Sequence, residues 1–322
     1  MALQAARTRK KEKAPSLDGG SKRSLGQRIW RDRYLLLLFL PCLIYYILFK
    51  YVPMWGVLIS FKDFKPFIGF AGSEWVGFKH YVNFFSNPDA WRVIRNTLLL
   101  GIYSLLWCFP FPIIFALVLN EITRTRFKKF VQTVSYMPHF LSAVVVCGMI
   151  SSFLSPVRGI VNTIITSCGG EMINFLSVAG WFRTIYVTSE VWQTLGWSAI
   201  VYMAAISNVD PQYYEAARLD GASRLRQVWS ITLPSIAPTV ATMLILRVGS
   251  VLDVGLEKAL LLSSPAISET ASIIPTYVYN QGLVSGNMSY ASAVGLFSSV
   301  VNLVLLVGAN YVSKKFSETG LF

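Results

Sequence analysis

The chain has 322 residues, of which 54% are hydrophobic and only 14% are charged. Because a soluble domain carries about 25% charged residues, this composition excludes an ordinary soluble protein. The apolar runs are long and continuous, unlike the alternating segments of about ten residues in a membrane β-barrel, so the sequence predicts an all-α membrane protein. The formal net charge is +13. Because the basic residues are distributed according to the membrane topology described below, we expect no nucleic-acid partner.

The sequence contains no group of residues that would support chemistry of its own. A Walker A pattern is absent, so we expect no ATP hydrolysis by this chain, and no paired carboxylates or histidine-based site supports a membrane enzyme. We predict no catalytic residue, no metal site and no cofactor. The cysteines lack metal-binding spacing and the histidines are isolated: Cys42, Cys108, Cys147, Cys168, His80 and His139.

Residues 1–33 are polar and strongly basic, and they predict a cytoplasmic tail whose first part is disordered. A cleaved signal peptide is disfavoured because the segment is long and charged and no small-residue cleavage site follows the next apolar run. Residues 317–322 are expected to form a second short tail in the cytoplasm.

Six apolar stretches are long enough to cross a membrane, which takes about 20 residues per helix. Lys50 and Pro53 interrupt the first stretch. An even number of spans places both termini on one side, and the lysines and arginines gather on that side. Positive charge favours the cytoplasm, so we expect a multi-pass membrane protein with both termini cytoplasmic. The predicted spans are 34–61, 97–119, 131–154, 184–206, 235–252 and 289–312.

The polar interruption between the fourth and fifth predicted spans carries the signals of two short helices at an elbow. Asp210 is a good N-cap before a proline, and Gly221 can end the first helix because glycine tolerates the left-handed conformation. Ser223 can cap the second helix. Pro234 disfavours helical geometry at Leu233, so we expect the second helix to stop there.

Within the elbow, Glu215-Ala216-Ala217, Asp220-Gly221-Ala222 and Leu233-Pro234 stand at a distinctive spacing. This pattern resembles the EAA signature of permease subunits of binding-protein-dependent ABC importers. The resemblance implies a six-helix type I importer fold over residues 34–316, in which the elbow 211–234 couples to an ATPase. It also implies that the protein lies in the bacterial inner membrane. It also implies several partners: a second homologous permease, two ATPase subunits that bind ATP and Mg, a periplasmic or extracellular solute-binding protein, and membrane lipid.

Further patterns extend the resemblance along the chain: Trp75-Val76-Gly77-Phe78, Asn96-Thr97, Tyr136-Met137-Pro138, and Gly159 followed by Asn162. They are similar to polysaccharide-type permeases related to the large maltose permease subunit, and within that branch to permeases for alginate oligosaccharides. This implies an oligosaccharide substrate, and an acidic one. The alternatives are a permease for a neutral oligosaccharide, and an ion-coupled secondary transporter, which would need intramembrane acidic relays or inverted repeats.

Arg247 lies within an apolar segment of the fifth predicted span. An arginine at a helix centre costs about 2.5–3.5 kcal/mol on insertion scales, so we expect it to face a cavity or a partner. Helical spacing places Arg247, Ser250, Val251 and Val254 on one face. The resemblance puts Arg247, Ser250 and Val254 at positions that contact sugar in the family, and the arginine favours an acidic sugar. The alternative is a structural salt bridge from Arg247 to Asp253 or Glu257.

The fourth predicted span adds candidate sugar contacts. Trp192 and Trp197 could stack on the C–H faces of a sugar ring, and Gln193 could fix its hydroxyls. The alternative is an interfacial aromatic belt, which is common in membrane proteins. Asp253, next to the Arg247 face, completes the predicted substrate path.

Overall fold

The computed structural model describes residue 30 and residues 32–317. Its contacts divide the chain into two units, Met1–Gly56 and Val57–Phe322. Most of the predicted N-terminal tail and nearly all of the predicted C-terminal tail therefore lie outside the described residues.

The first predicted span is helical over Arg33–Phe61 and long and apolar enough to cross a membrane. It consists of α2 (Arg33–Tyr46), a π-helical turn (Ile47–Tyr51), α3 (Val52–Met54) and a 3-10 segment (Trp55–Phe61). The π turn contains Lys50 and ends at Tyr51, two residues before Pro53, which has no N–H to donate to the preceding turn. The predicted interruption is therefore a change of helix type and not a break.

A small hairpin and the second span follow. Strand β1 (Lys62–Asp63) pairs antiparallel with β2 (Glu74–Trp75). The helices α6 and α7 together form a span, Pro88–Glu121, that starts before the predicted residue 97. The bounds of the helices in this region are α4 Gly69–Gly72, α5 Lys79–Ser86, α6 Pro88–Cys108 and α7 Pro110–Glu121.

The third predicted span, 131–154, is not one straight helix. Helix α8 (Thr125–Tyr136) continues as a 3-10 turn to Phe140, and α9 (Ala143–Phe153) then leaves at an angle of 99°. Ser142 caps α9 by accepting a hydrogen bond from the Val145 backbone N–H at 3.3 Å. The bend separates the two halves at Leu141, whose carbonyl accepts a bond from the fourth span. The expectation of a continuous helix is therefore corrected.

The elbow continues into the fifth span, contrary to the expected stop at Leu233. Leu233 is helical, with φ −61° and ψ −47°. A π-helical turn over Val228–Thr232 precedes Pro234 and accommodates its missing N–H. Arg224–Val248 is consequently one apolar span. The bounds are α10 Ile160–Ser167, α11 Phe182–Ser207, α12 Pro211–Leu219, α13 Arg224–Gln227 and α14 Leu233–Val248.

The C-terminal part returns across the unit as one long helix. Short helices α15 (Leu256–Leu262), α16 (Ser268–Ala271) and α17 (Ile274–Tyr279) precede a π-helical turn (Asn280–Val284) and α18 (Met288–Ser317). Within the described residues, four helices are long and apolar enough to cross a membrane, and the bent pair makes a fifth. Helix α11, which has 26 residues, covers the fourth predicted span. Each of the six predicted spans therefore overlaps helical structure, although several bounds differ.

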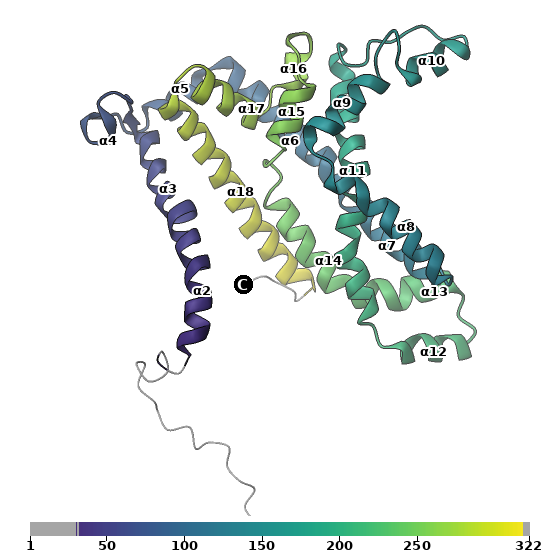
Figure 1. Cartoon of the computed structure of the whole chain (residues 1–322). Coiled ribbons are helices and arrows are strands. Elements are labelled where there is room, and N and C mark those ends of the chain that lie inside the picture. The colour runs from purple at the N-terminus through teal and green to yellow at the C-terminus, as the bar shows by residue number, and fades with distance from the viewer. Residues whose placement is uncertain (1–29, 31, 318–322) are drawn as a thin grey trace, which may run out of the picture. The chain divides into compact units, whose positions relative to one another are not determined.

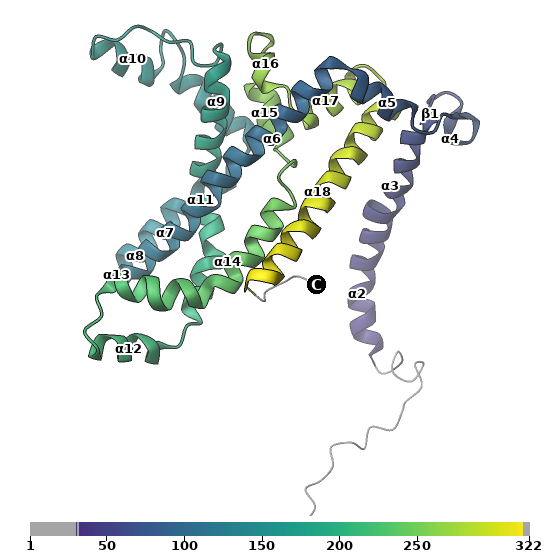
Figure 2. The same cartoon turned by 180° about the vertical axis from the view of Figure 1, so that it is seen from behind.

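Packing in the second unit brings distant helices together. Helix α11 contacts α6 and α7, and α14 contacts α18; Figures 1 and 2 show the elbow helices α12 and α13 at one end of the unit and α5, α16 and α17 at the other. The Asn96-Thr97 motif holds that second end: Asn96 donates to the Glu269 carbonyl at 2.7 Å, and Thr97 accepts from the Ile274 N–H at 2.8 Å.

Candidate translocation path and coupling elbow

Three helices meet at a polar contact between the two ends of the bundle. Arg247 on α14 forms an ion pair with Glu190 on α11, with Nη2 2.9 Å from Oε1. The same Nη2 donates to the Ser104 hydroxyl on α6 at 3.1 Å, and Ser104 donates to the other oxygen of Glu190 at 2.6 Å. The salt bridge considered from sequence had Asp253 or Glu257 as its acid; the acid is Glu190.

Glu190 is the main residue that the sequence reasoning missed. It is an acidic side chain within the predicted fourth span, and an ionisable group in a membrane helix is by itself a sign of function. The side chain of Glu190 is 20% exposed and that of Arg247 is 41% exposed. Part of the Arg247 side chain therefore remains exposed even while the guanidinium is paired.

The ion pair separates two cavities, and both Arg247 and Glu190 line each of them. The cavity nearer the elbow measures about 320 Å³ and includes Trp197, Tyr202 and Met243. The cavity on the other side measures about 30 Å³. Helix α14 runs away from the elbow. Met243, in the larger cavity, therefore lies on the elbow side of Arg247, and the loop after Val248, in the smaller cavity, lies on the far side.

Ser250, Asp253 and Val254 line the smaller cavity together with Arg247, but they do not continue its helical face. Helix α14 ends at Val248, so the predicted helix through residue 252 is wrong. Close packing holds the loop that follows: a Cβ added to Gly101 on α6 would lie 2.1 Å from the Val251 carbonyl oxygen. The absence of a side chain at Gly101 allows this approach.

The three candidates on α11 lie in different surroundings. Trp197 lines the larger cavity with Arg247 and stacks on His139, with 4.5 Å between ring centroids. Trp192 instead lines a separate apolar cavity of about 680 Å³. Gln193 donates to the Leu141 carbonyl at 3.0 Å, at the bend between α8 and α9. The structure therefore brings only Trp197 to the Arg247 site.

Lys258 on α15 adds a second cation that sequence reasoning did not single out. Its side chain is buried, and its Nζ lies 5.4 Å from the centroid of the Tyr186 ring. Burial lowers the pKa of Lys258 because it disfavours the charged form, and the attraction of Glu190 opposes this effect.

Local hydrogen bonds build the elbow as its sequence predicts. Asp210 accepts from the Gln212 N–H at 2.9 Å and caps α12. Gly221 has φ +76°, and the Ala222 N–H closes the turn on the Ala217 carbonyl at 2.9 Å, which is the Schellman arrangement that favours glycine. Ser223 caps α13 through the Arg226 N–H at 3.4 Å.

The elbow presents both charge and apolar surface. A cavity of about 830 Å³ is lined by residues that include Glu215, Arg218 and Arg224. Among the residues that the structure describes, Glu215 forms no ion pair, whereas Arg224 lies 3.5 Å from Glu121. Leu219 is 90% exposed and Leu225 is 74% exposed. Such exposed leucines beside charged groups are typical of a surface that binds another protein.

A bundle of long apolar helices, a charged pair beside internal cavities and a capped elbow at one end define a membrane permease. The chain belongs to the family of binding-protein-dependent transport system inner membrane components, whose model matches residues 92–318. Together with the relatives below, this makes it a permease of an ABC sugar importer, with the type I importer fold.

Two relatives come from Bacillus subtilis strain 168. Protein LplB is 47% identical over 313 residues, covering 97% of this chain and 98% of the relative. The polygalacturonan/rhamnogalacturonan transport system permease protein YteP is 48% identical over 295 residues, covering 92% of each.

Two solved structures have the same fold. One is a bacterial alginate ABC transporter in complex with an alginate pentasaccharide-bound periplasmic protein; a chain of it is 40% identical, with TM-score 0.85, covering 93% of this chain and 100% of that chain. The other is a bacterial ABC transporter that imports the acidic polysaccharide alginate, at 41% identity and TM-score 0.84, covering 92% and 100%.

Proposed function

We propose that this permease imports an acidic oligosaccharide and that Arg247 contacts the substrate carboxylate. The observation that carries the proposal is a partly exposed arginine beside a cavity within the membrane-spanning bundle. The names of the relatives support it, since YteP is assigned to polygalacturonan and rhamnogalacturonan and two structural neighbours to alginate.

The ion pair suggests how a sugar is recognised. A guanidinium has five N–H donors, and among the described residues the bonds of Arg247 to side chains of other helices use Nη2 alone. A substrate carboxylate can therefore take the remaining donors in a bidentate, charge-assisted contact. Glu190 then acts as an internal counter-ion. It neutralises the charge of Arg247 when no substrate is bound, and it competes with the carboxylate of an incoming substrate.

The elbow is the proposed coupling element, with Glu215, Ala216, Ala217, Asp220, Gly221 and Ala222 at its turn. It docks with its exposed leucines on a separate ATPase, and the free carboxylate of Glu215 pairs with a basic group there. ATP and Mg bind to that subunit and not to this chain. A second homologous permease completes the path, two ATPase copies drive it, and a solute-binding protein delivers the sugar at the opposite end.

This arrangement predicts which end of the bundle faces the cytoplasm. In a variant whose four cysteines are replaced by alanine, Ser86→Cys and Gln212→Cys introduce exposed single thiols at the two ends. In intact spheroplasts, an impermeant thiol reagent should label residue 86 and leave residue 212 unlabelled until the membrane is opened. The reverse pattern would place the elbow outside the cell and reject the proposed coupling role.

The transport proposal is tested by reconstitution in liposomes. The chain, its second permease, the ATPase and the solute-binding protein should together take up uronic-acid oligosaccharides when ATP is present on the ATPase side. Omitting the second permease should abolish uptake because one bundle cannot enclose a large sugar. Preferential uptake of a neutral oligosaccharide would contradict the acidic substrate, and uptake driven by an ion gradient without ATP would contradict the class of importer.

A further inference from the structure

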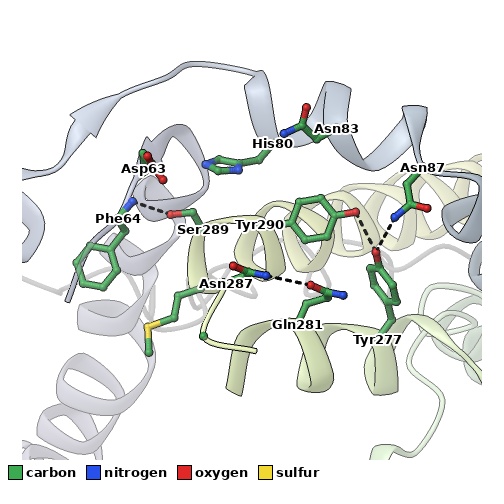
Figure 3. A pocket seen from close by; sticks show the side chains of 12 residues that line it. Asp63, Phe64, His80, Asn83, Asn87, Tyr277, Gln281, Asn287, Ser289 and Tyr290 are labelled. Atoms are coloured by element: carbon green, nitrogen blue, oxygen red, sulfur yellow. Dashed lines mark hydrogen bonds between the residues drawn. The ribbon is translucent and has the colours of Figure 1, made fainter. Parts of the chain in front are cut away.

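A polar cavity at the end of the bundle away from the elbow has no place in the proposed path. It measures about 410 Å³ and is lined from β1, α5, α17, the following π turn and the start of α18. Figure 3 shows these polar side chains around the cavity. We propose that this cavity binds one uncharged pyranose unit of a carbohydrate, separately from the carboxylate contact at Arg247.

Hydrogen bonds between distant segments preform the walls of the cavity. The Phe64 N–H donates to the Ser289 hydroxyl at 2.9 Å. The Tyr277 hydroxyl lies 3.0 Å from that of Tyr290 and accepts from the Asn87 amide at 3.3 Å. A site that is already ordered loses little conformational freedom on binding, which favours recognition of a small ligand.

Several polar groups at this cavity remain available to a ligand. Among the described residues, no hydrogen bond or ion pair reaches the carboxylate of Asp63 or the side-chain amide of Asn83. His80 is buried, and its Nε2 lies 3.1 Å from the Lys62 carbonyl. Since a carbonyl only accepts, Nε2 donates to it, and no hydrogen bond among the described residues reaches Nδ1.

This set of groups suits hydroxyls. A sugar hydroxyl both donates and accepts, so carboxylate, amide and imidazole groups can each satisfy one. The rings of Tyr277 and Tyr290 add apolar wall for the C–H edges of a pyranose. The volume lies within the range of about 300–1,000 Å³ that is typical of small-molecule sites.

The charges select against an acidic sugar at this position. Among the residues that the structure describes, Asp63 is the only acid that lines the cavity, and no lysine or arginine does. The ammonium of the adjacent Lys62 is hydrogen-bonded to the Phe70 carbonyl at 2.7 Å. A uronate would therefore meet the carboxylate of Asp63 with no cationic side chain from the described cavity wall to pair with. Two neighbouring hydroxyls of an uncharged sugar can instead donate to the two oxygens of Asp63.

The test measures binding to the full chain carrying Arg247→Met/Glu190→Gln, which removes the carboxylate contact proposed above. This parent protein is assembled with the second permease and the ATPase in lipid nanodiscs, without ATP and without the solute-binding protein. Saturation-transfer NMR compares a neutral methyl hexopyranoside with the corresponding hexuronate. The neutral probe should bind, and the hexuronate about ten-fold more weakly or worse. Asp63→Ala should weaken the neutral probe about ten-fold, as expected when a charge-assisted bond is lost. Asp63→Asn should reduce the difference in affinity between the neutral probe and the hexuronate, because it removes the repulsion between the two carboxylates.

Glu74→Ala is the matched control, because Glu74 pairs with Asp63 in the hairpin but does not line the cavity; it should bind the neutral probe as the parent does. If the Asp63→Ala protein does not assemble, Asn83→Ala replaces it in the test and should weaken the binding of the neutral probe. The proposal is overturned if the parent binds no neutral probe, binds the hexuronate equally well, or is insensitive to both substitutions. Binding needs no transport, so failure of uptake leaves this result intact.

Discussion

Replacing Arg247 with methionine is expected to lower the uptake of uronic-acid oligosaccharides by about ten-fold or more. A hydrogen bond to a charged group contributes about 1.5–3 kcal/mol, which corresponds to that range. Methionine keeps an unbranched side chain that is compatible with a membrane helix while removing the guanidinium. The measurement is ATP-driven uptake in liposomes that contain the complete importer and its binding protein, at matched protein content.

The ion pair requires a second variant, because Arg247→Met leaves Glu190 without its partner. Removing one member of a fully buried pair costs about 3–5 kcal/mol. This pair is partly exposed, so the single variant loses less stability than that, but the loss adds to the lost substrate contact. The double variant Arg247→Met/Glu190→Gln removes both charges and isolates the role in recognition. Unchanged uptake of acidic sugars in the double variant would mean that Arg247 only braces α6, α11 and α14.

Glu190→Gln examines the other half of the pair. It removes the internal carboxylate and leaves Arg247 in place, so acidic oligosaccharides should stimulate ATP hydrolysis at lower concentrations than in the parent. This outcome separates competition from bracing, since a purely structural pair would lose function in both single variants.

Gly221→Val is expected to reduce substrate-stimulated ATP hydrolysis several-fold. Gly221 has φ +76°, and a β-branched residue held in such a conformation costs about 1–3 kcal/mol. The strain opens the turn between α12 and α13, so the elbow can no longer seat rigidly on the ATPase. The readouts are ATP hydrolysis by the assembled importer and the affinity of the binding protein for sugar, which should not change.

Gly221→Asn is the matched control, because asparagine enters the left-handed region more readily than other side chains. It should retain most of the coupled hydrolysis. If Gly221→Val hydrolyses ATP and transports sugar as the parent does, the elbow does not carry the coupling.

Local features of this protein followed from its sequence. The caps Asp210 and Ser223 and the turn at Gly221 depend on bonds between residues a few positions apart, and the structure has all three. The long apolar segments likewise predicted the helices, because their burial in lipid requires backbone groups to be satisfied within each segment. The isolated Arg247 in such a segment was recognisable as unusual because a charged side chain is costly to place within a membrane.

Only the tertiary structure decided where the distant groups meet. Arg247 and Glu190 are 57 positions apart, and nothing in the spacing of either helix indicates that α6, α11 and α14 converge on one point. The end of α14 at Val248, the 99° bend before α9 and the cavity that joins Asp63 to Tyr277 also depend on contacts between separate segments. Helical periodicity describes one helix at a time, whereas side-chain packing between helices determines which charges pair and which cavities remain.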